Sequence, residues 1–298
     1  MRLWYSDHHA IPLPEGHKFP AGKYRLLREA LETDGFFEFA PAPPADAEAL
    51  GLAHDPAYVR AVIDGTVDAR LMRRIGFPWS PELARRSMAS VGGTLAAAED
   101  ALATGFGGNL AGGTHHAFYS EGAGFCVFND IAVAIRQFGR RTAVIDLDVH
   151  QGDGTAAIFD GDCRVLTVSL HGRNNFPFRK QRSGIDIALP DGTGDAEYLE
   201  RLAGVLPRVA EFGPEIVFYQ SGVDTLAGDR LGRMALSSEG LRERDRKVFE
   251  WARQAGLPIV VTLGGGYAEP ITKTVEAHAG TFRTAAAVLQ PFPPGGRH

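Results

Sequence analysis

Short apolar runs rich in β-branched residues alternate along the chain with longer segments whose apolar positions recur every three or four residues. The short runs predict strands, and the longer periodic segments predict helices. We expect strands at residues 2–5, 142–149, 163–170, 215–220 and 258–263. We expect helices at residues 22–33, 82–104, 129–138, 196–212 and 238–255, with glycine and proline stopping several of them before the next strand.

The later strands are almost continuously apolar, which is typical of a parallel sheet buried by helices on both faces. No shift in composition marks a linker, so the pattern predicts an α/β protein with a single domain over residues 1–298. We expect a central, mostly parallel sheet in this domain. The last eight residues, PFPPGGRH, are expected to form a flexible tail.

Composition narrows the expected environment of the protein. The 298 residues carry a net charge of −5, which predicts no general affinity for nucleic acid or acidic membrane surfaces. The two cysteines, Cys126 and Cys163, form no disulfide framework, and the first residues lack the basic start and apolar core of a signal peptide. No apolar run approaches the length of a membrane span. We therefore expect a cytoplasmic protein that binds neither nucleic acid nor membranes.

Polar or glycine-rich residues follow four of the predicted strands. Asp148 and His150 end one strand, and His171 ends the next. Asp224 follows the third, and the GGGY segment that ends at Tyr267 follows the fourth. The carboxyl ends of parallel strands meet at one edge of a sheet, where open α/β folds bind their ligands. The sequence therefore predicts one shared site at that edge.

The stretch VIDLDVHQGDGT places three carboxylates and a histidine close together after an apolar run. Asp146, Asp148 and His150 alternate, so on a strand they project to the same side. A divalent cation would offset the repulsion between such carboxylates, and oxygen ligands with one imidazole suit zinc in a catalytic site. Asp224 is the best candidate for a third ligand. The stretch alone would also suit an aspartate-rich turn before a helix, but Asp224 and nearby histidines favour the metal.

A histidine pair, His115 and His116, follows a glycine-rich turn. Adjacent histidines are often incidental, but beside a metal their near-neutral pKa suits proton transfer. Each would need an acceptor for its far nitrogen, and Asp146 and Asp153 could supply one each. Tyr267 could simply end a strand, yet after three glycines its phenol could reach the site and donate to an oxyanion.

These segments together resemble the histone deacetylase family of zinc amidohydrolases. The matching motifs, in the family's order, are GGTHHA, GFCVFNDIAVA, DLDVHQGDGT, TVSLH, SGVDTLAGD and LGGGY. The resemblance implies an arginase/deacetylase-like α/β fold with a narrow tunnel leading to zinc or ferrous iron. It implies metal ligands at Asp148, His150 and Asp224. It also implies a catalytic set of His115, His116, Tyr267, Asp146 and Asp153.

The resemblance extends to the tunnel and to a second cation. It places Gly124, Phe125 and Gly265 along the tunnel, with Phe176 or Phe178 on the opposite wall. It implies a monovalent-cation site, of the potassium type, formed by Asp146, Asp148, His150, Ser169 and Leu170, partly through backbone carbonyls. Two positions depart from many members. Gln151 stands where the best-known branch has a second histidine, and Lys23 where many members have an internal arginine. The chain looks closer to the short class IV and bacterial branch.

The expected activity is metal-dependent hydrolysis of an acyl-amine amide bond, with acylated lysine in a peptide or protein, or a small acylated amine, as substrate. Two alternatives are an acetylpolyamine amidohydrolase and a non-catalytic module that binds acyl-lysine. A binuclear manganese ureohydrolase would need further carboxylates at positions 152 and 226, which are Gly152 and Leu226. The loop from His171 to Asp186 carries four basic residues, Arg173, Arg179, Lys180 and Arg182, and predicts a basic tunnel rim that would repel polyamines.

Overall fold

The computed structural model describes residues 1–289 and places their strands in one parallel sheet. Among these residues eight strands pair in the order β2-β1-β3-β8-β7-β4-β5-β6, and every pairing is parallel. The strands are β1 (Arg2–Tyr5), β2 (Glu38–Pro41), β3 (Phe106–Asn109), β4 (Thr142–Asp146), β5 (Val165–Gly172), β6 (Ile185–Leu189), β7 (Ile216–Gln220) and β8 (Ile259–Thr262). The predicted tail lies outside the described residues.

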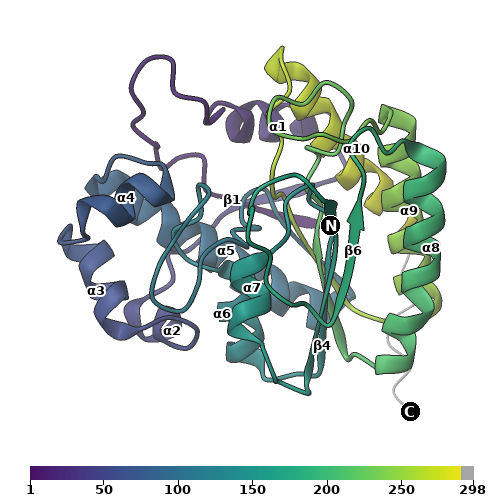
Figure 1. Cartoon of the computed structure of the whole chain (residues 1–298), viewed down its shortest axis with the longest axis horizontal. Helices are drawn as coiled ribbons and strands as arrows, with labels where there is room; N and C mark the ends of the chain where they lie inside the picture. Colours follow the sequence, from purple (N-terminus) through teal and green to yellow (C-terminus); the bar gives the residue numbers. More distant parts are fainter. Residues whose placement is uncertain (290–298) are drawn as a thin grey trace.

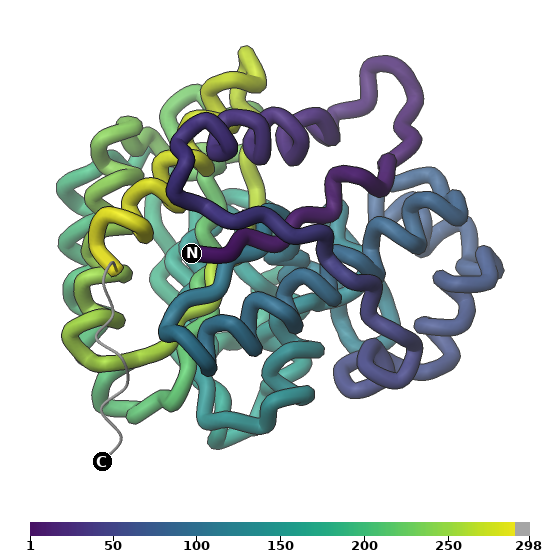
Figure 2. The backbone as a smooth tube through the Cα atoms, turned by 180° about the vertical axis from the view of Figure 1, so that it is seen from behind, coloured from purple at the N-terminus to yellow at the C-terminus, as the bar shows by residue number. Residues whose placement is uncertain are grey.

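Helices cover both faces of this sheet (Figure 1). They are α1 (Lys23–Glu32), α2 (Ala47–Gly51), α3 (Pro56–Asp64), α4 (Ala69–Ile75), α5 (Pro81–Thr104), α6 (Asp130–Phe138), α7 (Asp153–Ile158), α8 (Asp195–Phe212), α9 (Ser238–Gln254) and α10 (Ile271–Leu289). Figure 2 shows α1 beside α10, so the first and last helices described share one face. None of the helices within residues 1–289 has both the length and the apolarity needed to cross a membrane.

The strands are buried on both faces because their side chains alternate between two apolar clusters. In β7, Val217 and Tyr219 belong to the cluster that includes residues of α1, α8, α9 and α10, while Ile216 and Phe218 belong to the cluster that includes residues of α5 and α6. The neighbouring strand β8 divides its residues in the same way. This explains the continuous apolar runs, since a strand with helices on both sides needs no polar face.

All five predicted strands and all five predicted helices are present, with shifts of a few residues at their ends. The largest shift is in β4, which ends at Asp146 rather than at residue 149 because the following residues turn out of the sheet. The structure adds β2, β3, β6, α2, α3, α4, α7 and α10, which the apolar pattern did not separate from loops. Strand β3 is Phe-Gly-Gly-Asn, and its Gly107 lets α5 approach so closely that a Cβ would overlap the Ala97 carbonyl.

Phe218 tests how much the sheet depends on its central strand. It is 1% exposed between β4 and β8, so Phe218→Ala should lower the free energy of unfolding by about 3–5 kcal/mol. Phe178→Ala makes the same chemical change at a side chain that is 86% exposed, and should stay within about 0.5 kcal/mol of the wild type. Urea unfolding followed by circular dichroism measures both. Equal losses in the two variants would contradict this account of the core.

Candidate active site

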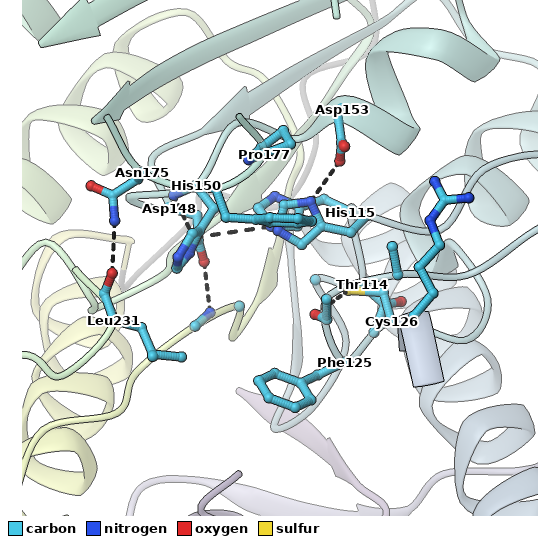
Figure 3. Close-up of a pocket in the computed structure, with 18 of the residues that line it drawn as sticks. Thr114, His115, Phe125, Cys126, Asp148, His150, Asp153, Asn175, Pro177 and Leu231 are labelled. Carbon is cyan, nitrogen blue, oxygen red and sulfur yellow. Dashed lines mark hydrogen bonds and ion pairs between the residues drawn. The ribbon is translucent and has the colours of Figure 1, made fainter. Parts of the chain in front are cut away.

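A cavity of about 740 Å³ opens at the carboxyl edge of the sheet, where the sequence predicts the site. Its wall includes His115, His116, Asp148, His150 and Tyr267, which come from the loops after β3, β4 and β8. Figure 3 shows Asp148, His150 and His115 clustered on one side of this cavity and Phe125 on the other. The structure therefore brings together side chains that lie far apart in the sequence.

Three predicted metal ligands converge at the base of the cavity. His150 Nδ1 lies 3.0 Å from Asp148 Oδ1 and 3.0 Å from Asp224 Oδ2. All three residues are buried, and their potential ligand atoms lie within 4.8 Å of one another. Apart from this contact with His150, the buried Asp224 Oδ2 accepts no hydrogen bond from the described residues. Two buried carboxylates that share one imidazole leave negative charge poorly compensated, so this trio fits a divalent cation.

The pKa values in the trio reflect its crowding. Burial raises the pKa of Asp224 to about 7, and the charge of Asp148 adds to the rise. Burial lowers the pKa of His150, but the two carboxylates outweigh it and raise that pKa to about 10. In the protein alone, a proton on His150 thus balances the two carboxylates. A ligating imidazole must be neutral, so a cation would take over this role.

The glycine segment after β8 closes the trio from one side. Gly265 N–H donates to Asp148 Oδ2 over 2.6 Å. A Cβ at Gly265 would overlap Asp224 Oδ2, so only glycine lets the backbone pass this close to both carboxylates. On the other side, Asp224 Oδ1 accepts from the Val149 N–H over 2.9 Å, which ties the β4 and β7 loops together.

The histidine pair has the carboxylate partners expected from the sequence. His115 Nδ1 lies 2.7 Å from Asp146 Oδ2, and His116 Nδ1 lies 2.6 Å from Asp153 Oδ1. Burial lowers the pKa of His115, but Asp146 and Asp148 outweigh it and raise that pKa to about 9. Burial and the neighbouring His115 lower the pKa of His116 to about 4. In the protein without a metal ion, His115 is therefore the more basic of the pair and His116 the one that favours the neutral form.

Asp130 holds the loop that carries the two histidines. Its carboxylate accepts from the backbone N–H groups of Gly113 and Thr114 over 3.0 and 2.8 Å, and from the Thr114 hydroxyl over 2.6 Å. Gln220 at the end of β7 also donates to the Gly113 carbonyl, over 2.7 Å. The sequence reasoning gave Asp130 no role. Its position within the GFCVFNDIAVA motif, at a predicted helix start, was the available signal.

Tyr267 lies on the cavity wall with its backbone fixed by Asp229, whose Oδ2 accepts from the Tyr267 N–H over 2.6 Å. Burial raises the pKa of the phenol, so it remains a hydrogen-bond donor at neutral pH. Lys23 is 1% exposed and donates from Nζ to the Gly264 carbonyl over 3.1 Å. The sequence reasoning missed Asp229, although it lies in the SGVDTLAGD motif.

Aromatic side chains narrow the approach to the histidines. Phe125 has a φ of 66°, and its ring centroid lies 6.1 Å from that of Tyr267. The Phe176 ring lies 4.9 Å from the His116 ring, and a Cβ on Gly124 would come within 3.1 Å of it. Phe178 is 86% exposed at the mouth. Of the two candidates left open by the sequence, Phe176 thus faces Gly124, and Phe178 marks the entrance.

The mouth of the cavity is basic, but with a different set of residues from the one predicted. Arg74, Arg179 and Arg233 line it, together with Glu121; Arg74 pairs with Glu121, and Arg233 pairs with Asp191 outside the lining. Arg173 and Arg182 lie outside the lining. Lys180 also lies outside it, because its ammonium donates to the carbonyls of Asn175 and Pro177, each over 2.6 Å. Of the four predicted rim residues, Arg179 alone lines the described cavity.

Gln151 fastens this loop to the metal-ligand turn. Its Nε2 donates to the Gln181 carbonyl and to Asp186 Oδ1, each over 2.7 Å, and its Oε1 accepts from the Gln181 N–H over 2.8 Å. The residue that departs from the best-known branch therefore connects His150 directly to the segment that forms the mouth.

The proposed second-cation residues share Asp148 and His150 with the trio and add three residues of β4 and β5. The β4–β5 register places Asp146 beside Ser169, and both Ser169 and Leu170 are buried. The monovalent cation itself stays a prediction. His171 is buried outside the cavity lining, with Nδ1 3.0 Å from Ser169 Oγ, so it does not join the site as the strand-end pattern indicated.

Comparison with known proteins gives a consistent result. A family model described as "Histone deacetylase domain" matches residues 17–282. An uncharacterised protein of Picosynechococcus is 44% identical over 294 residues, covering 95% of this chain and 98% of the relative. Histone deacetylase 2 of Arabidopsis thaliana is 32% identical over 277 residues, covering 87% of this chain and 72% of the relative.

The solved structure of acetylpolyamine aminohydrolase from Burkholderia pseudomallei superposes with a TM-score of 0.79 at 20% identity, covering 97% of this chain and 99% of that one. This likeness confirms the predicted arginase/deacetylase-like fold. The family model and the relatives each match most of the chain, and both point to the same family. The chain is a hydrolase that belongs to the histone deacetylase family.

Proposed function

We propose that the protein is a zinc-dependent deacylase that hydrolyses the amide bond of an N-acyl-lysine, releasing the free amine and a carboxylate. The observation that carries this proposal is the buried trio of Asp148, His150 and Asp224 beside two carboxylate-backed histidines. A metal site with one imidazole, two carboxylates and adjacent proton carriers matches the needs of amide hydrolysis. The deacetylase names of the relatives support the same chemistry.

In this proposal Asp148, His150 and Asp224 hold the zinc ion. When bound, zinc would polarise the acyl carbonyl and lower the pKa of a water molecule. The neighbouring carboxylates Asp146 and Asp153 are not zinc ligands in this proposal; each is hydrogen-bonded to one of the two catalytic histidines. The monovalent cation at Asp146, Asp148, His150, Ser169 and Leu170 is part of the same proposal.

The two histidines divide the proton transfers. His116 is neutral and accepts the proton of the attacking water, while Asp153 fixes the orientation of its ring. His115 holds its proton beside Asp146 and supplies positive charge to the site. The pair then protonates the departing amine. General acid–base catalysis of this type contributes about 10²–10⁴-fold.

Tyr267 donates from its hydroxyl to the acyl oxygen as negative charge develops there. Its raised pKa keeps the phenol protonated, and Asp229 holds its backbone in place. Phe125 and Phe176 line the path of the apolar lysine stem. The acyl-lysine chain would thus pass between apolar ring faces on its way to the metal.

A second candidate is an acetylpolyamine amidohydrolase, which the Burkholderia structure favours through its fold. The rim argues against it, because three arginines and one glutamate line the mouth. A polyamine carries further positive charges and meets like charge at the entrance. A non-catalytic acyl-lysine module is disfavoured because the ligands, both histidines and the tyrosine are all present.

The metal ligands can be tested by alanine substitution. Asp148→Ala, His150→Ala and Asp224→Ala should each abolish activity and tight zinc binding, because each removes one of three protein ligands. Asp160→Ala changes an exposed aspartate outside the site and should keep one zinc per chain. Elemental analysis of the purified variants measures this. Stoichiometric zinc in Asp224→Ala would show that the third ligand is misassigned.

Tyr267→Phe tests the oxyanion donor while keeping the ring. We expect kcat to fall by about 10²–10³-fold, with zinc content and Tm unchanged. Tyr119→Phe makes the same change at an exposed tyrosine outside the cavity lining and should leave kcat unaltered. Near-wild-type turnover in Tyr267→Phe would show that the Tyr267 hydroxyl has no role in catalysis.

The rim predicts substrate preference. kcat/KM should be higher on acyl-lysine peptides than on acetylputrescine or acetylspermidine. Arg179→Glu should narrow that gap by roughly tenfold at low salt, since electrostatic effects on association are screened by salt. Arg182→Glu is the matched control, because Arg182 is exposed but lies outside the cavity lining. Higher efficiency of the wild type on polyamines would move the enzyme to the polyamine class.

A further inference from the structure

Arg244 of α9 is completely buried, at 0% exposure, yet it does not line the active-site cavity. A buried guanidinium is costly unless its charge is paired and its N–H groups are hydrogen-bonded. Its surroundings therefore indicate what the charge is for. None of the catalytic roles proposed above uses it.

The Arg244 side chain has five N–H groups, and five contacts account for them. Nε and Nη2 each lie 2.8 Å from Asp245 Oδ1. Nη1 donates to the Gly222 carbonyl over 2.6 Å and lies 3.4 Å from the Leu147 carbonyl. Nη2 also lies 3.4 Å from the Ser221 carbonyl. The guanidinium thus contacts one carboxylate and three backbone carbonyls.

The three carbonyls belong to the two segments that carry the metal ligands. Leu147 lies between Asp146, the partner of His115, and Asp148. Ser221 and Gly222 follow β7 and lead to Asp224. Strands β4 and β7 are neighbours in the sheet, and their regular pairing ends at Asp146 and Gln220. A single guanidinium contacts the backbone of both segments that follow, where the sheet no longer fixes their relative position.

Hydrogen bonds from neighbouring elements hold Asp245, the carboxylate partner of Arg244, in place. Asp245 also accepts hydrogen bonds from the Tyr219 hydroxyl of β7 and, over 2.6 Å, from the Thr281 hydroxyl of α10. The Tyr198 hydroxyl of α8 lies 3.4 Å from the Leu147 carbonyl. Helices α8, α9 and α10 therefore all contribute to holding these carbonyls.

We infer that Arg244 is a positioning residue for the metal centre, fixing through the carbonyls of Leu147, Ser221 and Gly222 the separation of Asp148 and Asp224. This inference rests on the proposed metal site. The planar fork matters as well as the charge, because an ammonium has three donors in a tetrahedral arrangement and cannot span the same acceptors. Groups that orient metal ligands from behind typically change metal affinity about 10–100-fold when altered.

Arg244→Lys keeps the charge and removes the fork. Its affinity for Zn²⁺, measured on metal-free folded protein by competition with a chromophoric chelator, should fall about 10–100-fold. The rise in Tm on adding Zn²⁺ should shrink accordingly. Val248→Ala is the matched control, because Val248 is buried on the same helix and its truncation lowers Tm without touching the carbonyls. It should bind Zn²⁺ as the wild type does.

Wild-type zinc affinity in a folded Arg244→Lys variant would overturn the inference and leave Arg244 a purely structural residue. If that variant does not fold, Thr281→Val provides the test, because it removes one donor that anchors Asp245 at nearly constant volume. A several-fold loss of zinc affinity supports the inference, and unchanged affinity overturns it. A wild-type protein without zinc affinity would instead overturn the proposed function, and this inference with it.

Discussion

The structure depends on burying two carboxylates, Asp148 and Asp224, side by side at the base of the cavity. Each is 0% exposed, and an isolated buried carboxylate would normally take up a proton instead of keeping its charge. Every neighbouring element reduces this cost. Backbone N–H groups of Gly265 and Val149 donate to the carboxylates, and His150 lies between them. Apart from its contact with His150, Asp224 Oδ2 has no hydrogen-bond donor among the described residues, and a cation would compensate its charge.

The parallel sheet brings the two carboxylates together, although they are far apart in the sequence. Strands β4 and β7 pair in register from Thr142 with Ile216 to Asp146 with Gln220, so segments distant in the sequence end at the same height. The backbone groups freed at these ends need other partners. Part of that need is met within the site, where Leu147 N–H donates to the Gln220 carbonyl and Asp148 N–H to Asp146 Oδ1. The same irregular backbone that leaves the sheet builds the site.

The sequence was sufficient for features with a short-range pattern. The four strand ends predicted the edge of the sheet. The closeness of Asp148 and His150 was also predicted, but from an alternation along a strand, whereas β4 ends at Asp146 and the turn after it places both side chains. Features set by distant partners were not visible. The GLRERDRKV segment around Arg244 looks like the solvated face of a helix, yet the backbone carbonyls it reaches belong to other segments. Lys180 was expected at the rim, but two carbonyls of its own loop turn it inward. Asp130 and Asp229 act on backbone groups, which leave no trace in side-chain patterns.

Gln151 links the entrance of the cavity to its base, because it binds the mouth loop and directly follows the proposed metal ligand His150. His150 faces the two carboxylates, while the next residue grips the Gln181 backbone from both sides. The three hydrogen bonds of Gln151 therefore hold the mouth loop at a fixed place relative to the imidazole. A coupling between metal and substrate through this contact would be reciprocal, so each ligand would change the affinity for the other by the same factor.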